Sequence, residues 1–421
     1  MDIQITTFGA LLGLAVAIIL IIKKFQPAYS LILGALIGGL VGGAGLVGTV
    51  DVMMEGARGI MSAILRILTS GVLAGVLIKT GAAAKIADQI IRTLGEKRAL
   101  IALALSTLIL TAVGVFVDIS VITVAPIALA IGKKLGYSKF TVLLAMIGGG
   151  KCGNVISPNP NTIAASENFG VSLSSLMAAN IIPAIFGLVA TIIIANILAK
   201  KHAGDKIELN LEENEPQEEL PSFFAAIVGP LVAILLLSLR PIVGITVDPL
   251  IALPLGGIIG VLVMGKIRYI NDYMAFGLSK MMPVAILLIG TGTIAGVIKY
   301  SGVQASTISI LNAMHIPELL LAPISGILMG AATASTTSGA TIASATFAPA
   351  IISVGIAPLA GAAMVHAGAT VLDSLPHGSF FHATGGSVNM SINERLKLVP
   401  YEAAVGLTIT IVSTIMWGII M

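Results

Sequence analysis

A run of polar and ionisable residues interrupts an apolar stretch between His366 and His382. The front of the stretch is small and apolar, whereas residues 373–379 read DSLPHGS. Ionisable groups and proline are costly in hydrocarbon and are tolerated chiefly where they face a water-filled cavity or a bound solute. A second run at 148–162, GGGKCGNVISPNPNT, breaks another apolar stretch in the same way. Paired interruptions in the two halves of a membrane chain are typical of a transporter's binding site.

The chemistry of these breaks favours a small, hydroxylated anion. Each break exposes the N-terminus of a half-helix, whose unpaired N–H groups and positive dipole end attract negative charge. Serine, threonine and asparagine add neutral hydrogen bonds in both directions. The predicted substrate contacts lie in the two breaks and in the polar centres of two long apolar blocks: Ser120, Lys151, Asn154, Ser157, Asn159, Asn161, Thr162, Thr336, Thr337, Ser338, Thr341, Ser374, His377 and Ser379.

Three residues could carry a driving ion: Asp118, Asp373 and His377. An aspartate withdrawn from water can hold a proton, and a histidine titrates near neutral pH. Aspartate oxygens could instead bind sodium together with backbone carbonyls. Lys151, if buried, needs a partner, which could be the substrate carboxylate, Asp118 or Asp373. The alternative is a lysine at a helix end that extends its ammonium group to water.

The histidines give little support to a metal site. His366, His377 and His382 are eleven and five residues apart and lack the HExxH pattern. We rank His377 first because it lies within the break, and expect His366 and His382 to matter less. His366 could simply bond a neighbouring helix. We therefore expect no metal and no cofactor.

The composition predicts an all-α polytopic membrane protein. The chain has 421 residues, of which 57% are hydrophobic and 10% charged, and its mean hydropathy is +1.04. A soluble domain carries about 25% charged residues. Continuous apolar runs of roughly 17–25 residues match the hydrocarbon thickness and argue against a β-barrel. The net charge is +3, and the basic residues are not clustered into a patch, so no nucleic-acid partner is expected. The single cysteine, Cys152, excludes an intramolecular disulfide.

The first half, 1–201, is expected to cross the membrane five times. An amphipathic segment is expected at 79–98. The apolar block 99–131 is too long for one span and short for two, at about 1.5 Å per residue. Basic residues on both flanks favour a re-entrant hairpin with its tip near 118–123, and two short spans are the alternative. The crossings are expected at 8–22, 29–50, 60–78, 140–171 (broken) and 176–198.

The second half, 222–421, repeats this order after an acidic linker at 202–221. Spans are expected at 223–239, 250–264 and 282–298, followed by a second re-entrant block at 319–353, the break around Asp373 and a last span at 403–421. AGVLIK at 74–79 resembles AGVIK at 295–299. Five crossings in each half make the repeats inverted. The distribution of lysine and arginine, with Arg395 counted inside, predicts both termini outside and a cytoplasmic linker.

The chain resembles the gluconate permease (GntP-type) family of the ion transporter superfamily. The resemblance rests on the five-crossing halves, the paired blocks, and the breaks GNVISPNPNT (153–162) and LDSLPHGS (372–379). It implies a homodimer in the bacterial inner membrane, with a scaffold part and a moving transport part. It also implies elevator-type, proton-coupled import of sugar acids or other small hydroxy acids. Gluconate, glycerate, hydroxybutyrate and citrate-like acids all stay open.

Three other functions compete with this one. A sodium-coupled carboxylate transporter would use the same site, and a cation/proton antiporter also uses broken helices. Paired acidic residues in one segment would favour the antiporter, but Asp118 and Asp373 stand apart in the sequence. An intramembrane hydrolase would need a GxGD, serine-nucleophile or metal motif. We therefore do not expect an enzyme.

Overall fold

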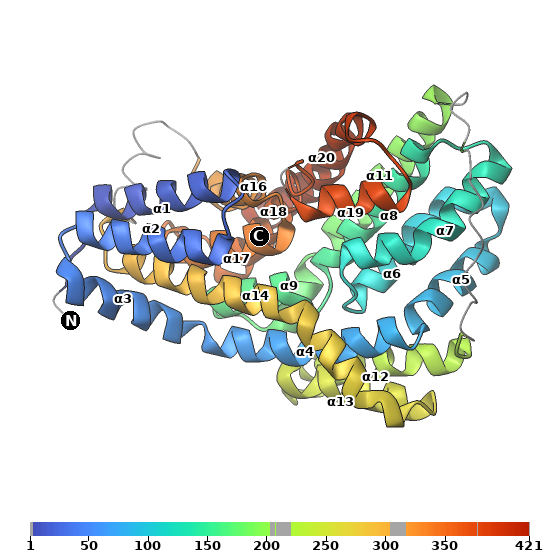
Figure 1. The fold of residues 1–421 in the computed structure, drawn as a ribbon, viewed down its shortest axis with the longest axis horizontal. Coiled ribbons are helices and arrows are strands. Elements are labelled where there is room, and N and C mark those ends of the chain that lie inside the picture. Colours follow the sequence, from blue (N-terminus) through green and yellow to red (C-terminus); the bar gives the residue numbers. More distant parts are fainter. Residues whose placement is uncertain (1–2, 203–206, 208–219, 304–316, 377, 421) are drawn as a thin grey trace.

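The structure, a computed structural model, describes residues 3–202, 207, 220–303, 317–376 and 378–420. Helices make up most of this part of the chain, as the composition predicts (Figure 1). The acidic linker predicted at 202–221 lies largely outside the described residues, and so does His377.

The first half contains a series of helices that includes one tight helical hairpin, α6–α7, and one interrupted pair, α8–α9. The predicted amphipathic segment is α5, followed by a short 3-10 turn, η1 (Glu96–Arg98). The helices are α1 (Thr7–Ile22), α2 (Pro27–Val41), α3 (Gly45–Gly59), α4 (Met61–Lys79), α5 (Ala82–Leu94), α6 (Ala99–Ala112), α7 (Val117–Leu135), α8 (Lys139–Val155), α9 (Pro160–Asn168), α10 (Leu173–Ala179) and α11 (Ile181–Lys201).

The second half also places a helical hairpin, α16–α17, before an interrupted pair, α18–α19, and a long final helix. The inverted relation between the halves and the re-entrant nature of the hairpins stay predictions. The helices are α12 (Phe223–Val243), α13 (Pro249–Val263), α14 (Ile270–Lys299), α16 (Leu321–Thr333), α17 (Thr336–Ser353), α18 (Pro358–Ala369), α19 (Ser379–Ser387) and α20 (Ile392–Ile415), with short turns η2 (Ile267–Tyr269), η3 (Glu318–Leu320) and η4 (Met416–Ile420).

Several helices match the thickness of a bilayer. Within the described residues, five helical stretches are long and apolar enough to cross a membrane, and shorter apolar helices such as α1, α2 and α13 accompany them. The five stretches are Met61–Lys79, Lys139–Asn168, Ile181–Lys201, Ile267–Lys299 and Ile392–Ile420.

The helices pack in two groups. In the first, α14 packs against α2, α3 and α4, α1 packs on α2, and α13 packs on α4 and α12. In the second, α8 packs against α6, α7, α11 and α20, while α18 packs against α16, α17 and α20. Figure 1 shows the first group running from α1–α3 to α12 and α13 along one side of the molecule. The groups touch where α14 meets α17 and where α4 meets α9.

The first hairpin turns earlier than its polar residues suggest. It reverses at residues 113–116, where Gly114 has a φ of +102°, so the residues expected at the tip, 118–123, instead form the first two turns of α7. The second reverses at Ala334, which has a φ of +47°. The left-handed backbone region, which glycine enters at little steric cost, sets the first reversal. The polar residues start the returning helices.

Three other predicted boundaries are wrong. The span expected at 29–50 is two helices, because the glycines at 43 and 45 take positive φ angles of 92° and 67° and end α2. The span expected from residue 282 begins at Ile270 and continues through Pro283. The last span begins at Ile392 rather than at 403. There Ser391 and Glu394 form a capping box, which satisfies the first N–H groups of α20.

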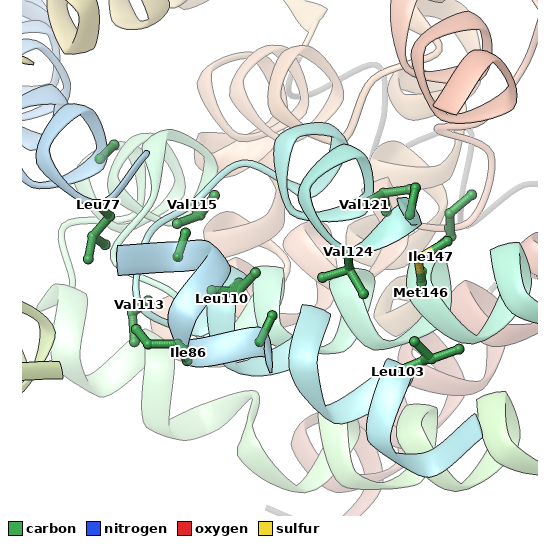
Figure 2. Close-up of a cluster of buried hydrophobic side chains, with 14 of the residues drawn as sticks. Leu77, Ile86, Leu103, Leu110, Val113, Val115, Val121, Val124, Met146 and Ile147 are labelled. Atoms are coloured by element: carbon green, nitrogen blue, oxygen red, sulfur yellow. The ribbon is translucent and has the colours of Figure 1, made fainter. Parts of the chain in front are cut away.

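A large apolar core surrounds the first hairpin. Leu103 and Leu110 of α6, Val121 and Val124 of α7, and Met146 of α8 are buried in one cluster (Figure 2). The amphipathic α5 contributes its apolar face to the same cluster. This packing holds the start of α7, which carries Asp118, in place.

Glycine allows α8 to approach α6 closely. A Cβ atom at Gly149 would lie 2.0 Å from the carbonyl oxygen of Ala104. We expect Gly149→Ala to lower the free energy of unfolding by about 1–3 kcal/mol, because the two backbones must separate. Thermal unfolding in detergent measures this. Gly386→Ala is the control, since nothing lies within 4 Å of its added Cβ. Equal unfolding temperatures for the two variants would contradict the close approach.

Candidate functional site

The starts of α7 and α17, the end of α8 and the second helix break meet around one cavity. Its volume is about 140 Å³. A neighbouring cavity of about 600 Å³ shares Phe116, Asp118, Ser335, Thr337 and Ser379 with it and is also lined by Ser338 and Lys280. The smaller cavity is lined by Phe116, Val117 and Asp118 at the start of α7, Asn154 near the end of α8, Ser335, Thr336 and Thr337 at the start of α17, and Asp373, Ser379 and Phe380 from the second break and α19.

Three helix N-termini face this cavity. They are the first turns of α7, α17 and α19, and only α17 has a side-chain cap, in which Ser335 Oγ accepts the Ser338 N–H at 3.2 Å. In α7, the carboxylate of Asp118 accepts the N–H of Ile119 at 2.9 Å. The remaining N–H groups of a first turn have no partner within the helix, and the dipole adds positive potential there. An anion in the cavity is therefore favoured by three helix ends.

A buried ion pair links the cavity wall to α8. Lys151 is 1% exposed, and its Nζ lies 2.6 Å from Oδ1 of Asp373 and 2.7 Å from the Thr370 carbonyl oxygen. Thr336 donates to Oδ2 of Asp373 at 2.6 Å, and Ser374 donates to Oδ1 at 2.9 Å. The pair joins the first broken helix to the second break and to the second hairpin. Of the partners considered for Lys151, the structure selects Asp373, so the lysine does not extend to water.

The first break is shorter than expected. Lys151 and Asn154 are still helical, because α8 continues to Val155, and the chain leaves the helix only at residues 156–159. Pro158 and Pro160 explain this position, since the residue before a proline is driven out of the helical region. The interruption therefore follows the prolines and not the lysine.

One asparagine satisfies both ends of this break. Asn159 Oδ1 accepts from the N–H and the hydroxyl of Thr162, both at 3.0 Å, which caps α9. Its Nδ2 donates to the Asn154 carbonyl oxygen at 2.7 Å, at the end of α8. Asn159 and Thr162 therefore hold the break in shape and are absent from the cavity lining.

The predicted site residues fall into two sets. Those that line the cavities are Asp118, Asn154, Thr336, Thr337, Ser338, Asp373 and Ser379. Lys151 and Ser374 lie behind the wall on Asp373, and Asn161 hydrogen bonds to Thr337. The hydroxyls of Ser120, Ser157 and Thr341 are buried without a hydrogen-bond partner in the described part of the chain. Exposed His382 donates from Nε2 to the carbonyl oxygen of Pro376 in its own loop, 2.9 Å away. Within the described residues, no group of three potential metal ligands occurs.

Sequence reasoning missed several residues of the site. Ser335 lines both cavities and caps α17, a role that a serine directly before a helical run can signal. Phe116 and Phe380 carry no polar signal that could have singled them out. A second buried ion pair, between Arg395 and Glu402, was also missed, and Arg395 was wrongly counted as an inside loop cation. Because Arg395 is buried, it does not count among the loop lysines and arginines that predict the orientation in the membrane.

The chain is similar to known membrane permeases along nearly its whole length. The family model of GntP family permeases matches residues 5–420. An uncharacterized transporter of Haemophilus influenzae is 58% identical over 417 residues, covering 99% of both chains. The high-affinity gluconate transporter of Escherichia coli K12 is 23% identical, covering 92% of this chain and 93% of its own. A D-serine transporter of Escherichia coli CFT073 is 22% identical, covering 80% and 81%.

A solved structure shares the fold. The crystal structure of the Alcanivorax borkumensis YdaH transporter superposes with a TM-score of 0.69 at 14% identity, covering 89% of each chain. The family match spans nearly the whole chain, and apolar helices of membrane-spanning length accompany it. The chain is therefore an integral membrane protein that belongs to the GntP family of permeases.

Proposed function

We propose that this protein imports a small hydroxylated or otherwise polar-substituted carboxylate across the bacterial inner membrane. The observation that carries the proposal is the convergence of three helix N-termini on one cavity lined by hydroxyl groups. Because Asp373 already neutralises Lys151, the anion would be held by helix ends and hydroxyls rather than by Lys151. The gluconate and D-serine relatives support this class, since both cargoes carry a carboxylate beside polar substituents.

We propose proton symport, with Asp118 as the proton carrier. Asp118 lines both cavities and is half-buried. Asp373 fits the role less well, because the ammonium of Lys151 and two hydroxyls stabilise its charged form. His377 and sodium coupling remain the alternatives, together with a cation/proton antiporter.

Elevator-type movement would account for the two packing groups. We propose that α1–α4 and α12–α14 form the scaffold of a homodimer, with the termini on the periplasmic side. The group around α8, α17 and α18 would move with the cargo. Arg66 on α4 pairs with Glu167 on α9 at 2.7 Å across the boundary, and this ion pair would have to open during the movement.

Uptake into proteoliposomes tests the proposed function. Purified protein would be offered labelled gluconate, glycerate and 3-hydroxybutyrate under an inward proton gradient, an inward sodium gradient, or neither. We expect accumulation of at least one acid under the proton gradient alone. Accumulation that follows only the sodium gradient would replace proton symport by sodium symport. If none of a broad panel of acids accumulates while sodium–proton exchange occurs, the antiporter replaces the importer.

Asp118→Asn is expected to abolish proton-driven accumulation, because the amide cannot carry a proton. Exchange of cargo across the membrane without a gradient should persist, since the other lining groups are unchanged. Both are measured as uptake and counterflow in the same proteoliposomes. Asp51→Asn on α3 is the control, because Asp51 is exposed and is not among the residues that line the cavity. Full proton-driven accumulation by Asp118→Asn would assign the coupling elsewhere.

A further inference from the structure

A chain of three polar side chains runs from a buried histidine to the cavity. His366, on α18, is 0% exposed. Its Nε2 lies 3.2 Å from the amide nitrogen of Asn161 on α9, and the amide oxygen lies 2.9 Å from the hydroxyl of Thr337 on α17. Thr337 in turn lines both cavities. The three residues therefore connect a fully buried imidazole with the surface that a cargo would touch.

The arrangement of this amide leaves one hydrogen-bonding group unpaired. If the Asn161 NH₂ group faces His366, Nε2 must accept, and the proton of the neutral ring must lie on Nδ1. Nδ1 is buried and has no hydrogen-bond partner in the described residues. An orphaned buried N–H is rarer and costlier than an orphaned acceptor.

Turning the amide about its Cβ–Cγ bond removes this unpaired donor. The ring proton then lies on Nε2 and is donated to the amide oxygen. The amide NH₂ group donates to the oxygen of Thr337, which leaves the Thr337 hydroxyl hydrogen free to point into the cavity. The exchange of oxygen and nitrogen keeps both heavy-atom separations. Only an unpaired lone pair on Nδ1 remains.

We propose that His366 is a positioning residue for the cargo. In the loaded protein it carries its proton on Nε2, orients the amide of Asn161, and thereby makes the Thr337 hydroxyl a hydrogen-bond donor to the carboxylate. The inference rests on the proposed function, because an anion is what needs a donor there. It explains why a polar ring that does not line the cavity is kept completely buried beside it.

Nitrogen-15 NMR of histidine-labelled protein in lipid, saturated with the acid that the wild type binds best, tests the proton's position. The His366 resonance is identified by its loss in His366→Gln. We expect a protonated Nε2 and an unprotonated Nδ1. The opposite tautomer, or a doubly protonated ring at pH 7, would overturn the proposal. A wild type that binds no acid from the panel would instead contradict the proposed function.

Binding measurements test the contact from Asn161 to Thr337 without relying on His366 variants. Thr337→Val should weaken acid binding about 10- to 100-fold, the value of a hydrogen bond to a charged group, whereas Thr337→Ser should bind like the wild type. Asn161→Asp offers only acceptors, so the Thr337 hydroxyl would donate to residue 161 and not to the cargo. Adding Thr337→Val to this variant should therefore cause no further loss of acid binding. Wild-type affinity in Thr337→Val, or multiplicative losses in the double variant, would overturn the proposal.

Discussion

Lys151→Met is expected to abolish uptake and to lower the free energy of unfolding by about 3–5 kcal/mol. The ammonium is 1% exposed and pairs with Asp373 at 2.6 Å. Without it, the carboxylate stays buried, and its hydrogen-bond partners among the described residues are the hydroxyls of Thr336 and Ser374. Thermal unfolding in detergent and uptake into proteoliposomes measure the two effects.

A double replacement separates stability from transport at this pair. Because two buried charges can be exchanged for apolar groups of similar volume at little cost, Lys151→Met with Asp373→Leu should recover most of the lost stability. Uptake should stay absent, since Thr336 loses its acceptor at the cavity wall and the second break loses its link to α8. A double variant that transports would show that the pair is structural only.

Arg395→Met is expected to cost a similar 3–5 kcal/mol in the free energy of unfolding. Arg395 is 1% exposed and forms a two-pronged ion pair with the fully buried Glu402. It also donates to Thr384 at 3.2 Å and lies 5.0 Å from the ring centre of Phe381. Removing it leaves a carboxylate uncompensated inside α20. The loss would appear in thermal unfolding, with uptake falling because less protein is folded.

The matched double variant should behave differently here. Arg395→Met with Glu402→Met should restore stability and uptake together, because neither residue lines the cavity. The contrast with Lys151 and Asp373 distinguishes a packing pair from a site pair. Restored stability without uptake would indicate that the Arg395–Glu402 pair takes part in transport.

Sequence reasoning located the breaks from residues that the bilayer disfavours. Prolines, an aspartate and a lysine inside apolar runs are informative because hydrocarbon penalises each of them. Five of the predicted site residues do line one cavity: Asp118, Asn154, Thr336, Thr337 and Asp373. The same argument placed the first hairpin turn wrongly, because a turn needs permissive backbone angles, as at Gly114, and not polar side chains.

The missed features share a different cause. Arg395 looked like a loop cation because the last span was expected to begin at residue 403, which left both Arg395 and Glu402 outside it. In the structure both residues lie within α20, about two helical turns apart. Phe116 and Phe380 reach the cavity because they stand at the starts of α7 and α19. Their apolar side chains gave no sign of this position in the sequence.

The sequence by itself determined that this is a helical membrane protein whose two halves are each interrupted by a polar break, because composition and apolar run length respond directly to the bilayer. Only the tertiary structure decided which polar residues meet. It pairs Lys151 with Asp373, 222 residues apart, and leaves Ser120 and Thr341 outside the cavity lining. Such contacts depend on how helices from both halves pack, and no local pattern in the chain encodes that packing.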